Sequence, residues 1–182
     1  MANAVLGYYQ EHHIPYTVHL VTRLDRDTSG LMLIAKHRLS HSILFQDQQV
    51  GRIHRSYFAC ISGHMAQTQG TIDEPIGRKP GSIIERQVHV DGKCAVTDYH
   101  VIKQEEKYSF VEVKLRTGRT HQIRVHFAYI GHPLLGDDLY GDDQTLMNRH
   151  ALHCYDLSFV HPLTGEEMTF SQPLPADMRK FL

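Results

Sequence analysis

A charged segment that runs directly into an apolar one, at residues 21–35, constrains the fold more than any other part of this chain. Arg23–Asp27 contains two arginines and two aspartates in five positions, and Leu31–Ala35 is wholly apolar. This pattern predicts a charged loop followed by a buried strand over about residues 30–36. Charge at the edge of a core is costly unless it is paired or used. The loop is therefore either a surface turn stabilised by ion pairs or a place where chemistry occurs.

The loop also has a recognisable signature, because Arg23-Leu24-Asp25-x-x-Thr28-Ser29-Gly30 resembles the RLDxxTSG motif of the RluA/RluD-type RNA pseudouridine synthases. Residues 55–63 (RSYFACISG) and 117–126 (TGRTHQIRVH) resemble two later blocks of the same family, in the same order. Shorter matches follow in the C-terminal part, at Gly131–Asp137, Tyr140-Gly141, Ala151–His153 and His161-Pro162. Four ordered blocks favour the chemical interpretation of the loop over the surface turn.

The resemblance implies an isomerase (an intramolecular transferase) that converts uridines of RNA to pseudouridine without a metal, nucleotide or redox cofactor. It places the catalytic carboxylate on Asp25, acting as nucleophile or as base. It also places an active-site tyrosine on Tyr57, whose ring stacks on the target uracil and whose hydroxyl could move a proton. Arg124 is expected to form an ion pair with Asp25. These three residues are the predicted catalytic group.

Further residues of the same blocks are expected to bind the RNA substrate, namely Arg23, Arg119, His121, Gln122 and Ile123. Arg23 is suited to filling the stack that a flipped uridine vacates, and Arg119 to holding a phosphate, with surface ion pairing as the alternative for both. Thr22 stands where the family commonly has histidine. Asp27 is expected to fix the loop rather than act as a second catalytic acid.

The bulk composition agrees with one domain. A chain of 182 residues with 41% apolar content can form one well-buried domain, so residues 1–182 are expected to be a single catalytic domain. Relative to the resembled family, this domain is expected to lack the usual N-terminal strands and the N-terminal RNA-binding domain. Three scattered cysteines indicate reduced thiols, and without a membrane-length apolar run or a signal region we expect a soluble, cytoplasmic protein.

The charge distribution helps to indicate which class of partner the protein binds. A net charge of −1 argues against nonspecific nucleic-acid binding, but residues 114–124 contain four Lys or Arg and no acid. Fifteen histidines include no metal-binding motif, so no metal is expected. RNA is the expected partner, ribosomal RNA of the large subunit rather than transfer RNA, and the protein is expected to be a monomer that binds no membrane.

Periodicity and turn residues predict an α+β fold with a mostly antiparallel sheet and flanking helices. Helices are expected over residues 2–11, 39–51 and 119–130. Strands are expected over 30–36, 55–61, 82–90, 93–103, 107–116, 150–160 and 166–171. Asp91-Gly92 predicts a hairpin between the strands at 82–90 and 93–103, and residues 70–81 are expected to be a loop that either lies against substrate or merely connects.

Two rival functions remain open at this stage. The first is a hydrolase that uses Asp25 with Asp27 or a glutamate as an acid–base pair on a glycosidic bond. The second is a noncatalytic RNA-binding module or fragment, which the missing N-terminal strands of the resembled domain would favour. Release of a free base or sugar distinguishes the first rival, and binding without conversion distinguishes the second.

Overall fold

The computed structural model describes residues 1–141 and 145–182. The helices of this part are α1 (Ala2–Glu11), α2 (Arg38–Gln49), α3 (Gln122–Tyr129) and α4 (Ala176–Arg179). Its strands are β1 (His19–Leu20), β2 (Ser29–Gly30), β3 (Ile34–Ala35), β4 (His54–Ser62), β5 (Gln69–Asp73), β6 (Ile76–Arg78), β7 (Arg86–Val88), β8 (Val96–Gln104), β9 (Tyr108–Leu115), β10 (Leu152–Val160) and β11 (Glu167–Ser171). The predicted helices near 2–11 and 39–51 and most of the predicted strands are therefore present.

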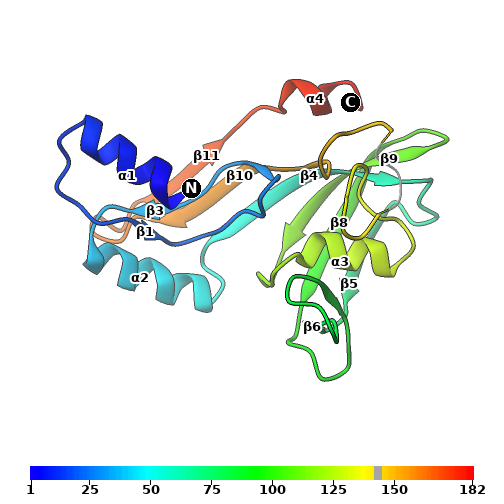
Figure 1. The fold of residues 1–182 in the computed structure, drawn as a ribbon, viewed down its shortest axis with the longest axis horizontal. Helices are drawn as coiled ribbons and strands as arrows, with labels where there is room; N and C mark the ends of the chain where they lie inside the picture. The colour runs from blue at the N-terminus through cyan, green and yellow to red at the C-terminus, as the bar shows by residue number, and fades with distance from the viewer. Residues whose placement is uncertain (142–144) are drawn as a thin grey trace.

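Across the two described segments, seven strands form one central sheet in the order β11-β10-β4-β9-β8-β5, with β2 lying parallel to β10. All the other pairings in this sheet are antiparallel. Figure 1 shows α1, α2, β1 and β3 at one end of the molecule and α3 with β5, β8 and β9 at the other, joined by the long strands β4 and β10. The predicted α+β fold with a mostly antiparallel sheet is confirmed.

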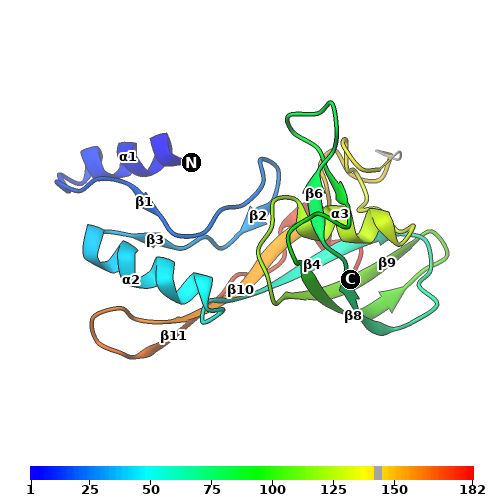
Figure 2. The same cartoon turned by 90° about the horizontal axis from the view of Figure 1, so that it is seen from below.

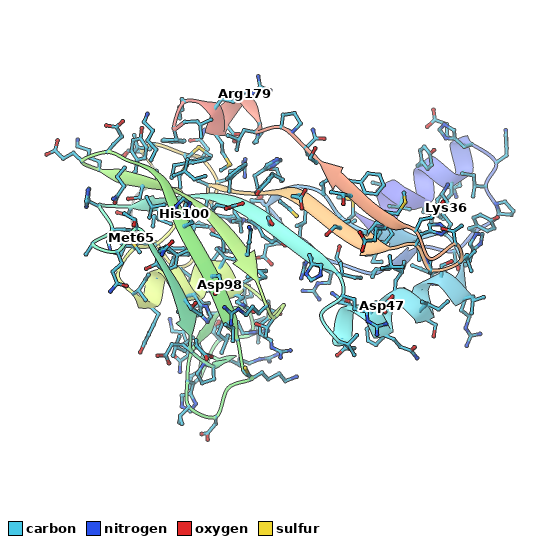
Figure 3. All side chains as sticks on the ribbon, turned by 180° about the vertical axis from the view of Figure 1, so that it is seen from behind. Lys36, Asp47, Met65, Asp98, His100 and Arg179 are labelled. Atoms are coloured by element: carbon cyan, nitrogen blue, oxygen red, sulfur yellow. The ribbon has the colours of Figure 1, made fainter. Side chains whose placement is uncertain are left out.

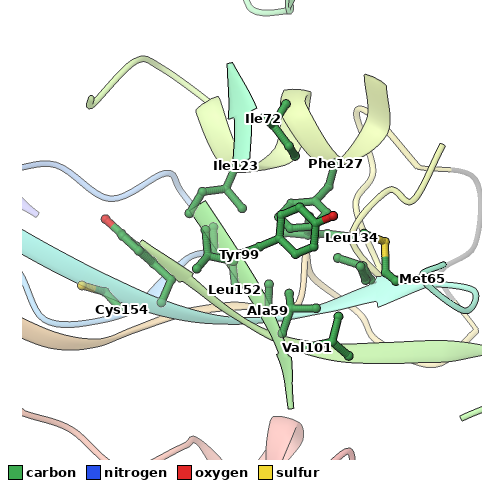
Figure 4. Packing of buried hydrophobic residues seen from close by; sticks show 14 residues of the cluster. Ala59, Met65, Ile72, Tyr99, Val101, Ile123, Phe127, Leu134, Leu152 and Cys154 are labelled. Carbon is green, nitrogen blue, oxygen red and sulfur yellow. The ribbon is translucent and has the colours of Figure 1, made fainter. Parts of the chain in front are cut away.

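Helix α3 covers one face of this sheet. Its Ile123 and Phe127, four residues apart and so on one side of the helix, enter a core with Val111 and Val113 of β9. Figure 4 shows Ile123 and Phe127 above Tyr99 in this cluster. Phe127 is fully buried, and burying a side chain of this size contributes about 1.5–3 kcal/mol to stability. This packing fixes the position of the other residues that α3 carries.

The opposite face of the sheet is covered by α4 and the chain that leads into β10. Met178 of α4 and Leu135 pack there against Cys60 and Phe110 of the sheet. The side-chain alternation of a β-strand is clear on β8, where Thr97 and Tyr99 are buried. On the same strand, Asp98 and His100 point outward, as the view from behind in Figure 3 shows. No helix of the described residues is long and apolar enough to cross a membrane.

The prediction of a strand over residues 82–90 that pairs with 93–103 is wrong. The segment forms only β7, which pairs with β6, and the two strands belong to an arm (residues 76–93) that protrudes beside α3 in both Figure 1 and Figure 2. The Asp91-Gly92 turn returns the chain to Ile76, which bridges to Lys93. The edge of β8 is instead occupied by β5, whose Ile72 is buried. The predicted loop at 70–81 thus contains most of β5 and all of β6.

Two predicted boundaries also differ from the structure. The strand expected at 30–36 is split into β2 and β3, because the chain leaves β10 after Gly30 and pairs again with β1 at Ile34. The helix expected from residue 119 begins at Gln122, because His121 has a left-handed backbone conformation with φ of 57°. A left-handed residue cannot continue a right-handed helix. Residues 117–121 therefore form a turn that faces the charged loop.

Candidate active site

The charged loop between β1 and β2 carries Asp25, and hydrogen bonds from distant segments hold both ends of the loop. At the first end, the buried hydroxyl oxygen of Thr22 accepts a hydrogen bond of 2.9 Å from the backbone N–H of Leu33. At the second end, the Thr28 hydroxyl forms a 2.7 Å hydrogen bond with Nε2 of His150. Thr22, the departure from the resembled motif, thus has a structural partner of its own.

Gly30 allows the end of the loop to lie flat against β10. Its φ is +108°, and a Cβ atom at this position would lie 2.0 Å from the carbonyl oxygen of Cys154. Only glycine fits so close an approach of two backbones. Arg149 adds two hydrogen bonds to the same stretch, donating to the Asp27 carbonyl at 3.0 Å and the Ser29 hydroxyl at 3.3 Å. The loop is therefore fixed to the central sheet just after Asp25.

The Asp25 carboxylate faces two side chains from the 117–129 region. Its Oδ2 lies 3.8 Å from Nη1 of Arg124, and its Oδ1 lies 3.9 Å from Nε2 of His121. The predicted Asp25–Arg124 ion pair is thus present, between groups that are 20% and 6% exposed. The Asp27 carboxylate instead pairs with the neighbouring Arg26 at 2.9 Å, and its role as a loop-fixing acceptor stays a prediction.

Arg124 has a closer partner that the sequence analysis did not predict. Its Nε and Nη2 donate hydrogen bonds of 2.7 and 2.6 Å to the two oxygens of Asp137, which is fully buried. Burial raises the pKa of Asp137, but the hydrogen bonds from Arg124 and from the backbone N–H groups of Leu139 and Tyr140 outweigh it, so the pKa lies below its ordinary value. Asp137 thus stays charged and orients the arginine.

Tyr57 lies on β4, where it is 4% exposed and lines the same site. Burial raises the pKa of its phenol well above the ordinary value, and the positive charge of Arg55 only partly opposes this rise. The phenol therefore stays neutral at physiological pH. A neutral, buried ring suits stacking on a base, and it does not suit proton removal by a phenolate.

His121 and Gln122 lie side by side at the start of α3, but their side chains face different groups. Burial lowers the pKa of His121 below its ordinary value, and the opposing effect of Asp25 does not offset this, so the imidazole is neutral. The Gln122 amide uses its polar atoms inside the protein. Its oxygen accepts from the Thr117 hydroxyl and the Arg119 backbone, and its nitrogen donates to β8. This geometry favours Gln122 as a support for the 117–121 turn.

A cavity of about 390 Å³ opens above Asp25, between the α2 end of the molecule and the start of α3. All eight residues predicted for the site line it, namely Arg23, Asp25, Tyr57, Arg119, His121, Gln122, Ile123 and Arg124. His41 and Phe45 of α2 contribute to its wall, and so does Arg55 of β4. Within residues 1–141 and 145–182, neither Arg23 nor Arg55 is engaged in an ion pair. The cavity therefore offers free positive charge beside one carboxylate.

No group of three or more His, Cys, Asp or Glu side chains among the described residues is arranged to hold a metal ion. The donors around Asp25 are a guanidinium and an imidazole. The site as built consists of a carboxylate, cations, a neutral phenol and a neutral imidazole.

Comparison with known proteins agrees with this geometry. A sequence model of the family described as RNA pseudouridylate synthase matches residues 4–129. The chain belongs to this family. The match includes the loop with Asp25, strand β4 with Tyr57 and the start of α3 with Arg124.

Two curated relatives, both RNA pseudouridine synthases, match the chain over nearly its whole length. It is 54% identical over 182 residues to an uncharacterized RNA pseudouridine synthase, YjbO, of Bacillus subtilis, covering 100% of the chain and 64% of the relative. It is 40% identical over 190 residues to ribosomal large subunit pseudouridine synthase D of Escherichia coli K12, covering 97% of the chain and 58% of the relative. The RluA/RluD-type resemblance is confirmed, and the chain spans about three fifths of the length of these relatives.

A solved structure of the same family has the same fold. Human RNA Pseudouridylate Synthase Domain Containing 1 aligns with a TM-score of 0.81 at 26% sequence identity, covering 96% of this chain and 76% of that one. The family fold thus accommodates this chain over nearly its whole length.

The sequence analysis missed three residues of the site, Asp137, Tyr140 and Arg55. A signal for the first two was present, because the Gly131–Asp137 and Tyr140-Gly141 matches belong to the family resemblance. Nothing local in these stretches indicates that they fold against Arg124 and His121. Arg55 begins the 55–63 block of the resemblance, but only the position of its guanidinium beside Gly118, at the cavity wall, assigns it to the site.

Proposed function

We propose that this chain is the catalytic part of an RNA pseudouridine synthase, an isomerase in which Asp25 is the essential carboxylate. One observation carries the proposal. Asp25 lies in a cavity with Arg124 and His121 facing its two oxygens, and the neutral ring of Tyr57 lines the same cavity. Membership of the RNA pseudouridylate synthase family supports this assignment.

The reaction breaks the bond between N1 of uracil and C1′ of ribose and forms a bond between C5 and C1′. The proton of C5 leaves, and N1 gains one, so the product is an isomer of the substrate. Asp25 acts on the sugar or the base as nucleophile or as base, and both roles need the ionised carboxylate. A guanidinium 3.8 Å away supplies positive charge for that purpose.

The substrate enters the cavity as a single flipped nucleotide. Flipping costs a few kcal/mol, and filling the vacated stack offsets part of that cost. In this proposal the exposed Arg23 fills the stack, the ring of Tyr57 lies against the uracil, and Arg119 binds a backbone phosphate. A cavity of about 390 Å³ falls within the size range of small-molecule pockets and suits one nucleoside.

The proposed substrate is ribosomal RNA of the large subunit. The 40% identity to ribosomal large subunit pseudouridine synthase D of Escherichia coli supports it. With ribosomal RNA as the substrate, the proposed location is the cytoplasm, and the proposed state is a monomer. Transfer RNA is the alternative substrate, to be distinguished by the position of the modified uridine.

The test compares the 182-residue chain with its Asp25→Asn variant, which removes the charge and keeps the shape. Both are incubated with unmodified large-subunit ribosomal RNA and with transfer RNA, and pseudouridine is measured by mass spectrometry. Product from the wild type alone is the expected result. Equal product from the variant would overturn the role of Asp25.

The same experiment separates the rival functions. Release of free uracil or ribose would indicate the hydrolase, although the pairing of Asp27 with Arg26 argues against a second catalytic acid there. RNA binding without product, by folded wild type and variant alike, would indicate a noncatalytic binding module.

A further inference from the structure

A continuous row of polar groups connects the protruding arm to Asp25. The hydroxyl of Tyr140 accepts a 2.8 Å hydrogen bond from the backbone N–H of Arg86, on β7 of the arm. The same hydroxyl lies 2.8 Å from Nδ1 of His121. On the other side of that imidazole, Nε2 faces Oδ1 of Asp25 at 3.9 Å.

The direction of these hydrogen bonds follows from their chemistry. A backbone N–H can only donate, so the Tyr140 oxygen is the acceptor from Arg86. The hydroxyl proton is then directed to Nδ1 of His121, since no other acceptor for it is found in the part of the chain that the structure covers. A neutral imidazole that accepts at Nδ1 carries its proton on Nε2. That proton points towards Asp25.

We propose that Tyr140 is a positioning residue that fixes the tautomer of His121, so that its Nε2–H is held towards Asp25 and couples the arm to the catalytic carboxylate. The proposal rests on the proposed function for its catalytic consequence only. With Arg124 directed at Oδ2, the carboxylate has a donor facing each oxygen. The 3.9 Å separation is longer than a hydrogen bond, and contacts of catalytic groups are often long without substrate and tighten when it binds.

The backbone of His121 gives independent support. Apart from glycine, only His13 and His121 have positive φ in the described residues. A left-handed conformation at such a residue is strained and persists where the surroundings impose it, commonly at functional sites. Here it directs the imidazole between Tyr140 and Asp25, just before α3 begins. The depressed pKa of His121, caused mainly by burial, agrees with the neutral form that the chain of donors requires.

At the arm, the end of this row of polar groups is also held by hydrogen bonds. The guanidinium of Arg86 donates 3.0 Å hydrogen bonds to the carbonyl oxygens of Ile84 and Glu85. Lys79 on the facing side of the arm bonds the Glu85 carboxylate at 2.6 Å. The Arg86 N–H is therefore tied to the rest of the arm, and a displacement of the arm would release the Tyr140 hydroxyl.

The first test measures the tautomer directly. Nitrogen-15 NMR of the imidazole, assigned with the His121→Gln variant, should show Nε2 protonated and Nδ1 unprotonated in the wild type. In Tyr140→Phe, which keeps the ring beside Arg124 and His121, the Nδ1-protonated tautomer should increase. An Nδ1-protonated wild type, or an unchanged tautomer in Tyr140→Phe, would overturn the proposal. This measurement does not depend on activity, so it stands even if the proposed function fails.

The second test is kinetic and uses a matched control. Tyr155→Phe also removes one hydroxyl, which donates to Glu112 on the sheet, and Tyr155 does not line the cavity. The single-turnover rate on RNA should fall about tenfold in Tyr140→Phe, the equivalent of one ordinary hydrogen bond, with RNA affinity unchanged. Tyr155→Phe should keep the wild-type rate and the wild-type RNA affinity. Equal rates in Tyr140→Phe and wild type would refute the coupling, and unfolding curves of both variants confirm that they are folded.

Discussion

Arg124 and Asp137 form the tightest charged contact in the site, through hydrogen bonds of 2.7 and 2.6 Å between two buried side chains. Asp25, the proposed catalytic carboxylate, lies farther from the same arginine, at 3.8 Å. The buried aspartate therefore satisfies the guanidinium, and the proposed catalytic one is left with a directed but looser contact. This arrangement leaves the Asp25 carboxylate free to reach a substrate.

Asp137→Asn should impair both stability and turnover. Removing one partner of a buried pair leaves the other charge uncompensated, which costs about 3–5 kcal/mol. We expect the urea unfolding free energy to fall by about 3 kcal/mol and pseudouridine formation to fall about 100-fold, the rate equivalent of about 3 kcal/mol. The matched control is Asp138→Asn, an exposed carboxylate 3.6 Å from Arg124, which should remain within about 1 kcal/mol of wild type. Equal effects of the two variants would contradict the orienting role of Asp137.

Gly30→Ala should displace the loop that carries Asp25. The new Cβ would lie 2.0 Å from the Cys154 carbonyl oxygen, so β2 must separate from β10. Gly51→Ala is the matched control, because its φ is also positive, +76°, but nothing lies within 4 Å of its Cβ. The control should lose only about 1 kcal/mol of stability, the cost of the left-handed backbone. Gly30→Ala should lose clearly more stability in urea unfolding, and its turnover should fall in activity assays. Similar losses in both would show that strain alone matters at Gly30.

His150 should make stability depend on pH between about 4 and 6.5. Burial lowers its pKa from 6.5 to about 4, so the folded protein binds fewer protons than the unfolded chain in this range. Stability from this group is therefore fully present above pH 6.5 and is lost as pH falls towards 4, by roughly 3 kcal/mol in total. His150→Gln, which can still bond Thr28, should show a smaller decline in urea midpoints over this range. Parallel curves for wild type and variant would exclude His150 as the source.

Arg119→Ala should weaken RNA binding to a similar extent for every RNA sequence. The Nε of Arg119 bonds the Cys94 carbonyl at 2.8 Å, which leaves the rest of the guanidinium at the cavity for a phosphate. Loss of one phosphate contact should reduce the slope of log affinity against log salt by about 1. Arg116→Ala is the control, because Arg116 is already paired with Asp98 at 2.7 Å. An unchanged salt slope in Arg119→Ala would remove Arg119 from the RNA interface.

Local patterns were sufficient for much of the fold. The alternation of Val111 and Val113 with Glu112 and Lys114 predicted β9, because side chains of a strand alternate between faces. The arm was mispredicted because Asp91-Gly92 and its flanking residues are compatible with several partners. In the structure β7 pairs with β6, and β5 pairs with the edge of β8. Which strands pair depends on how they come together in the fold. Short-range patterns do not encode such a choice.

The sequence by itself determined which residues to examine as a site, since the charged loop, the 55–63 block and the 117–126 block each identified residues that line one cavity. Only the tertiary structure decided how these residues are held. Thr28 and His150 are 122 positions apart, and Asp137 and Tyr140 reach Arg124 and His121 from a separate segment. The reason is physical. Residue type specifies what a side chain can donate or accept, but the partner is chosen when packing buries both and leaves each no alternative.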